Sequence, residues 1–226
     1  MQIPKITVEQ VAAEQKRRKQ NLISSYFPDT GPHRRELYPQ HMAFFKATSE
    51  HKETAFICGN RIGKSDAMVF ACTVFLTGRY PHWWEGKRFK RPVNILVAGE
   101  TSKLVRDSIQ AKFLGGLGER GTGMIPADCI LSASSKSGVV DAIDTVRVKH
   151  PYGTSIMNMM SYDQGREAFQ ATARDVVALD EEPPMNIYTE CLMRTMTTDG
   201  IVMAVFTPMK GVTEVTKYFM TPEVRK

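Results

Sequence analysis

Gly59-Asn60-Arg61-Ile62-Gly63-Lys64-Ser65 is the stretch of sequence that decides the fold. It follows a short apolar run, 54–58, and precedes a helical pattern that extends from Lys64 to about Thr77. Between a buried strand and a helix, a glycine-rich turn can hold phosphate, because its backbone amides turn inward and the helix N-terminus adds partial positive charge. The segment therefore predicts an α/β protein with a phosphate-binding loop.

Within this loop, the residue types suit a nucleotide and its metal ion. We expect Lys64 to reach the β- and γ-phosphates and the Ser65 hydroxyl to ligate Mg²⁺. The pattern departs from GxxxxGK[ST], because Cys58 takes the first glycine position and the first glycine falls one place later. The alternative is a glycine-rich turn that merely precedes Lys-Ser. The expected nucleotide contacts are Gly59, Asn60, Arg61, Ile62, Gly63, Lys64 and Ser65.

A second motif, residues 175–182, is an apolar run that ends in carboxylates. We expect Asp180 to hold Mg²⁺, directly or through water, and Glu181 to orient and deprotonate an attacking water; Glu182 is the less suitable base. Taken alone, the acidic cluster is better explained as a solvated turn before two prolines. Paired with the phosphate loop, it indicates hydrolysis of a nucleoside triphosphate with water as the acceptor.

Apolar runs alternate with helical segments along the rest of the chain. Predicted strands cover 54–58, 93–98, 146–148, 155–160, 176–179 and 201–206, and predicted helices cover 7–24, 64–77, 102–114 and 186–197. This alternation is typical of a mainly parallel sheet flanked by helices. We expect an N-terminal helical appendage over residues 1–50 and the core over 51–226.

Composition excludes several classes of protein. Of the 226 residues, 42% are hydrophobic and 24% charged, as in globular domains rather than disordered or membrane chains. The longest nearly apolar run, 67–76, is too short to cross a bilayer, and no secretion signal opens the chain, so we expect a cytoplasmic protein. The four cysteines lack zinc or disulfide spacing. The net charge of +6, concentrated in the first half, suits a polyanionic partner.

Several short motifs resemble, in order, those of a known family. They are Tyr38-Pro39-Gln40, the loop at 59–65, TGRYPHWWEGKRF at 77–89, SYDQGREAFQ at 161–170, VVALDEEP at 176–183 and FTP at 206–208. The family is the ATPase domain of the large terminase subunits, the DNA-packaging motors of tailed bacteriophages. The resemblance covers most of the chain. It implies a P-loop NTPase fold of the additional-strand, catalytic-glutamate type, with ATP and Mg²⁺ as ligands.

The resemblance also implies roles for three further side chains. Gln40 would contact the adenine, Arg61 would touch the γ-phosphate, and Thr207 would couple hydrolysis to DNA movement. From the sequence alone, Thr207 is equally well explained as part of a strand-ending Thr-Pro turn. The implied partners are double-stranded DNA, further copies in a homo-oligomeric ring, a portal protein and a small terminase subunit, in the host bacterial cytoplasm.

The sequence departs from the family pattern in two places. Many members carry an Arg-Gly pair before the acidic strand, whose arginine reaches a neighbouring subunit's nucleotide, but Gln170-Ala171 stands at that place here. Arg166 and Arg174 are the nearest substitutes for this trans finger, and surface ion pairs are the alternative for both. The family's C-terminal nuclease domain has no counterpart in these residues, so we expect no DNA cleavage by this chain.

A basic and aromatic segment, residues 79–91, could contact DNA phosphates without reading sequence. The alternative packs Trp83 and Trp84 on the core beneath a solvated basic rim. Two rival functions also remain open. One is a helicase or translocase with an Asp-Glu box, and the other is a nucleotide-binding assembly protein without turnover.

Overall fold

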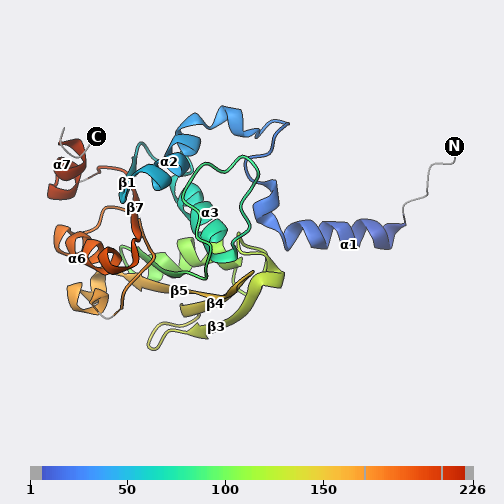
Figure 1. The fold of residues 1–226 in the computed structure, drawn as a ribbon. Coiled ribbons are helices and arrows are strands. Elements are labelled where there is room, and N and C mark those ends of the chain that lie inside the picture. The colour runs from blue at the N-terminus through green and yellow to red at the C-terminus, as the bar shows by residue number, and fades with distance from the viewer. Residues whose placement is uncertain (1–6, 171, 210, 222–226) are drawn as a thin grey trace.

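The computed structural model describes residues 7–170, 172–209 and 211–221, and within them a seven-stranded sheet forms the centre of the molecule (Figure 1). Its order is β1-β7-β6-β2-β5-β4-β3. The pairs from β1 through β5 are parallel, and β4 and β3 add antiparallel pairs at one side. The strands are β1 (Glu53–Ile57), β2 (Asn94–Gly99), β3 (Ile130–Ser135), β4 (Ile143–His150), β5 (Gly153–Ser161), β6 (Val176–Asp180) and β7 (Ile201–Phe206).

Helices cover both faces of this sheet because alternate residues of its central strands point to opposite sides. In β2, Ile95 and Val97 pack into one apolar cluster and Leu96 and Ala98 into another. The first cluster holds α2 (Pro39–Glu50), α3 (Lys64–Thr77) and α5 (Ala111–Leu114), and the second holds α6 (Met185–Thr195) and α7 (Glu214–Met220). The α/β prediction is confirmed, and β7 is the additional strand between β1 and β6.

Helix α3 spans the predicted residues and is buried along nearly its whole length. An apolar surface all around a helix is typical of a helix enclosed by the core. It begins directly after the phosphate loop and ends at Gly78, whose φ of 63° is the left-handed conformation that glycine adopts at helix ends. Among the described residues, no helix is both long and apolar enough to cross a bilayer.

The N-terminal residues divide into two parts. Helix α1 (Val8–Lys19) has the predicted capping box, in which Thr7 and Gln10 exchange hydrogen bonds, buries none of its residues and projects from the body (Figure 1). Helix α2, by contrast, buries Phe44 and Phe45 in the core. Of the described residues between 7 and 50, only the α1 segment therefore stands apart.

Four elements differ from the sequence-based expectation. The first helix ends at Lys19, and the predicted helix over 102–114 has a π-helical middle between α4 (Ser102–Leu104) and α5. Strand β3 and helix α7 were not predicted. Strand β3, with the sequence ILSASS, is mostly exposed and lacks the apolar alternation that identifies a strand.

Candidate phosphate and metal site

The phosphate loop, residues 59–65, lies where β1 ends, at the edge of the sheet where β6 and β7 also end. We call this the carboxyl edge. Gly63 has a φ of 82°, and a Cβ built on it would lie 3.3 Å from Nε2 of His41, so both backbone conformation and space favour glycine. Arg61 also has a positive φ, 63°, and is exposed. The loop thus has the tight, left-handed turns that expose backbone amides.

Lys64 points back across this loop. Its Nζ donates to the carbonyl oxygens of Gly59 (2.8 Å) and Cys58 (3.3 Å) and to Oγ1 of Thr207 (2.7 Å). Thr207 directly follows β7, so the structure brings the loop lysine together with the expected coupling residue. Only 7% of Lys64 is exposed.

Ser65 and Asp180 meet at the same edge. The Ser65 hydroxyl donates to Oδ1 of Asp180 at 2.6 Å, and the carboxylate is 8% exposed. Burial, together with the nearby Glu181 charge, raises the pKa of Asp180 to about 6, although the Ser65 hydrogen bond acts in the opposite direction. A buried carboxylate beside a hydroxyl offers the hard oxygen ligands that Mg²⁺ prefers, and a cation there would offset the cost of burying the charge.

This raised pKa predicts an effect on stability. The folded chain binds the Asp180 proton more tightly than the unfolded chain, so this group's contribution is most favourable below its ordinary pKa of 3.8 and is lost as the pH rises through about 6. We expect Asp180→Asn, measured without Mg²⁺ by urea unfolding at pH 7.5, to raise the free energy of unfolding by on the order of 1 kcal/mol. The gain should shrink toward pH 4. A variant less stable than wild type at pH 7.5 would show that Asp180 carries no such burial cost.

Two adjacent glutamates have different environments. Glu181 is exposed, has a φ of 63°, and donates its backbone N–H to the carbonyl oxygen of Val205 at 2.9 Å. A left-handed conformation is uncommon for a residue with a Cβ and is concentrated at functional sites. Glu182 instead accepts hydrogen bonds from the hydroxyls of Thr213 and Thr216 through one carboxylate oxygen. Glu181 is therefore the more available of the two for a water molecule.

The backbone behind these glutamates is held by Tyr162, which sequence reasoning missed. Its hydroxyl donates to the carbonyl oxygens of Asp180 (3.0 Å) and Glu181 (3.1 Å). Tyr162 follows β5 and is 7% exposed. Its position in the SYDQGREAFQ motif was the available signal.

Next to Gly63 is an aromatic cavity of about 380 Å³. Its lining includes Tyr26, Phe27, Tyr38, His41 and Asp66. Gln40, the expected adenine contact, does not line this cavity. It is exposed on the far side of α2, in a groove along β1 that Tyr218 and Phe219 also line. Tyr38, from the same Tyr-Pro-Gln motif, is the residue that faces the loop's cavity.

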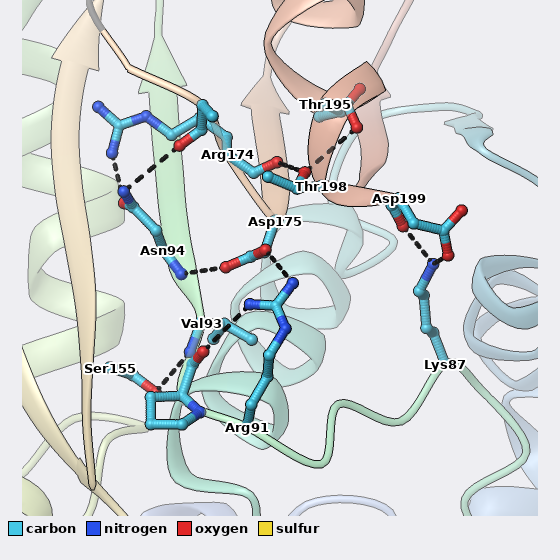
Figure 2. A network of polar contacts seen from close by, with 12 residues as sticks. Lys87, Arg91, Val93, Asn94, Ser155, Arg174, Asp175, Thr195, Thr198 and Asp199 are labelled. Carbon is cyan, nitrogen blue, oxygen red and sulfur yellow. Dashed lines mark hydrogen bonds and ion pairs between the residues drawn. The ribbon is translucent and has the colours of Figure 1, made fainter.

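The two candidate finger arginines are placed differently. Arg166 is exposed and donates its Nε to Oε2 of Glu190 at 2.9 Å, where Glu190 is 1% exposed. Arg174 is 8% exposed and precedes β6, at the opposite, amino edge of the sheet. There its guanidinium donates to the side-chain oxygen of Asn94 (Figure 2). It also donates to the side-chain oxygen of Asn158. The expectation of Arg174 as a finger is corrected, because a buried guanidinium bonded to two amides cannot reach a neighbouring subunit.

The basic segment 79–91 also lies toward the amino edge, because it leads into β2. Trp84 is buried, and Trp83 stacks on Phe70 with ring centroids 5.8 Å apart, as the packing alternative predicts. Three of its cations form ion pairs within the chain. Lys87 pairs with Asp199 and Arg91 with Asp175 (Figure 2). Arg79 pairs with Asp128. These pairs account for three of the charges that the sequence left available to DNA.

Comparison with known proteins identifies the family. Residues 55–226 match the model described as terminase large subunit, T4likevirus-type, N-terminal. The large terminase subunit of Salmonella phage P22 is 33% identical over 207 residues, which cover 82% of this chain and 42% of that protein. The chain thus spans about two fifths of that relative's length.

A solved structure has the same fold. The large terminase from a thermophilic bacteriophage, in complex with ADP, superposes with a TM-score of 0.50 at 14% identity, over 74% of this chain and 37% of that one. The residues that match the family model make up about three quarters of the chain. They include the phosphate loop, the acidic end of β6, and β7, the strand that lies between β1 and β6. The chain belongs to the large terminase subunits of phage DNA packaging.

Proposed function

We propose that this chain hydrolyses ATP and that the hydrolysis drives double-stranded DNA into a viral procapsid. The observation that carries the proposal is the meeting, at one edge of the sheet, of Lys64, the Ser65–Asp180 pair and the exposed Glu181. Phosphoryl transfer to water requires this combination of a phosphate cradle, a metal site and a water-orienting carboxylate. Membership of a packaging family favours DNA translocation over strand separation by a helicase.

In this mechanism, the backbone amides of residues 59–65 and the Lys64 ammonium bind the β- and γ-phosphates. Ser65 and Asp180 would hold Mg²⁺, which would neutralise phosphate charge when bound. Arg61, on its left-handed backbone, lies within the loop and adds positive charge at the γ-phosphate. We place the base in the aromatic cavity beside Gly63, where Tyr38 and Tyr26 offer stacking surfaces, and not at Gln40.

Glu181 orients the attacking water and accepts its proton. Its carboxylate is exposed, whereas that of Glu182 is held by two threonine hydroxyls. The Tyr162 hydroxyl holds the peptide that carries Glu181, which fixes the direction from which the carboxylate approaches.

Subunit and DNA contacts complete the proposal. We infer that copies assemble into a ring in which Arg166 of one subunit reaches its neighbour's nucleotide, and that Thr207 couples hydrolysis to movement. Arg166 donates its Nε to the buried carboxylate of Glu190. Its two terminal nitrogens would then bind an anion of the neighbouring subunit's nucleotide. DNA would be held through its phosphates without sequence preference, with a portal protein and a small terminase subunit as further partners.

Nucleotide binding tests the first step. We expect ATPγS to bind the wild-type chain in calorimetric titrations, more tightly with Mg²⁺ than with a chelator. Lys64→Ala should weaken binding by about 10²-fold, because it removes a charge-assisted contact to two phosphates. Arg147→Ala, which removes an exposed cation on β4, is the matched control and should bind as wild type does. Equal binding by the Lys64 and Arg147 variants would contradict the assignment of the loop.

A further inference from the structure

The side chain of Asn60 faces another segment of the chain. Its Oδ1 accepts a hydrogen bond from Oγ1 of Thr207 at 2.9 Å, and its Nδ2 lies 3.8 Å from Sδ of Met209. Both partners belong to the segment that follows β7, 147 and 149 residues away in sequence. Asn60 therefore connects the phosphate loop to the segment that follows β7.

The Thr207 hydroxyl also contacts Lys64. It accepts from Nζ of Lys64 at 2.7 Å and lies 2.9 Å from two acceptors, Oδ1 of Asn60 and the carbonyl oxygen of Cys58. A hydroxyl has a single proton, so the two acceptors compete for it. Which acceptor receives the proton depends on how the hydroxyl is turned, and the Lys64 contact influences that orientation.

Lys64 has no spare donor. An ammonium carries three N–H groups, and Nζ has three oxygen partners, the carbonyls of Cys58 and Gly59 and the Thr207 hydroxyl. A phosphate oxygen that engages Lys64 must therefore replace or share one of these contacts. The two carbonyls lie at the start of the phosphate loop and directly before it, whereas Thr207 belongs to a separate segment.

We infer that Asn60 is a positioning residue that transmits the engagement of Lys64 with phosphate to the segment after β7. When Lys64 turns toward phosphate, the Thr207 hydroxyl loses its donor and Asn60 becomes its remaining side-chain partner. The hydrogen bond between Thr207 and Asn60 then keeps Thr207 and Met209 in a fixed position relative to the loop during turnover. This inference rests on the proposed function, since it requires that the loop bind a nucleotide.

A double-mutant cycle tests the inference, with Asn60→Ala, Thr207→Val and the combined variant assayed for phosphate release and ATPγS affinity. We expect Asn60→Ala to lower kcat by about tenfold, the value of one good hydrogen bond, with KM changed less than about threefold. The combined variant should be no slower than the slower single variant, because both changes break one unit. Thr207→Ser, which keeps the hydroxyl, should restore most of the rate. Additive losses would overturn the inference.

Hydrogen exchange gives a readout that a merely structural role would not produce. We expect ATPγS to change amide exchange in the segment after β7 in the wild-type chain and not in Asn60→Ala, even though that variant still binds ATPγS. An unchanged response in the variant would overturn the inference while leaving the ATPase proposal intact. Failure of the wild-type chain to bind ATPγS would instead overturn the proposed function, and the inference with it.

Discussion

Replacing Glu181 by glutamine is expected to stop phosphate release while leaving ATP bound. The amide has nearly the same shape as the carboxylate but cannot take a proton from water, and a general base contributes about 10²–10⁴-fold to a rate. We expect kcat to fall within that range, measured by continuous phosphate release at saturating MgATP. Affinity for ATPγS should change less than about threefold, since Glu181 is assigned to the water and not to the phosphates.

Glu182→Gln is the matched control for this experiment, because it removes an identical charge from the next residue. An amide oxygen can still accept from Thr213 and Thr216, so the local structure should persist. We expect a rate within about threefold of wild type. Equal losses in the two variants would mean that negative charge at this turn matters and that proton transfer at Glu181 does not. A larger loss in Glu182→Gln would reverse the assignment.

Removing the Arg166 guanidinium should lower kcat at least as much as the Glu181→Gln substitution does. An arginine finger is worth about 10³–10⁵ in rate, and Arg166→Ala is expected to lose activity in that range if the finger acts between subunits. The Glu190 carboxylate, 1% exposed, would lose one of its cations in this variant but would keep Arg194 at 3.0 Å. The thermal unfolding of Arg166→Ala should therefore be measured together with its kinetics, to show that the variant remains folded.

Mixing two inactive variants separates a trans finger from a local role. A Glu181→Gln copy can lend its intact Arg166 to the site of an Arg166→Ala copy, whose Glu181 is intact. Random mixing in a ring should place such a pair at about a quarter of the interfaces and restore phosphate release there. No recovery on mixing, with both variants folded and binding ATPγS, would exclude Arg166 as a residue shared between subunits.

The sequence predicted the sheet because its signals were strong and local. Buried parallel strands are continuous apolar runs, and the glycine-rich turn before Lys64 indicated where one strand ended and a helix began. The carboxyl ends of parallel strands meet at one edge, so the meeting of Ser65 with Asp180 followed from chain order. Strand β3 gave no such signal, because its side chains are largely solvated.

Side-chain direction was the part that sequence could not supply. Arg174 and Arg166 are equally basic in the sequence, yet one is bonded to two asparagines inside the amino edge and the other is exposed. Gln40 and Tyr38 are two residues apart but face different hollows, because they lie on different sides of the start of α2. The partners of Asn60 are likewise remote in sequence and depend on the order in which β1 and β7 pair.

The measurement that tests the central claim most directly is phosphate release from ATP with Mg²⁺ by the wild-type chain, followed over a wide range of protein concentration. The account predicts release that requires Mg²⁺ and rises faster than linearly with concentration, because the complete site uses residues from two copies. Bound ATP without phosphate release at every concentration would contradict it, and the chain would then be a nucleotide-binding protein without turnover.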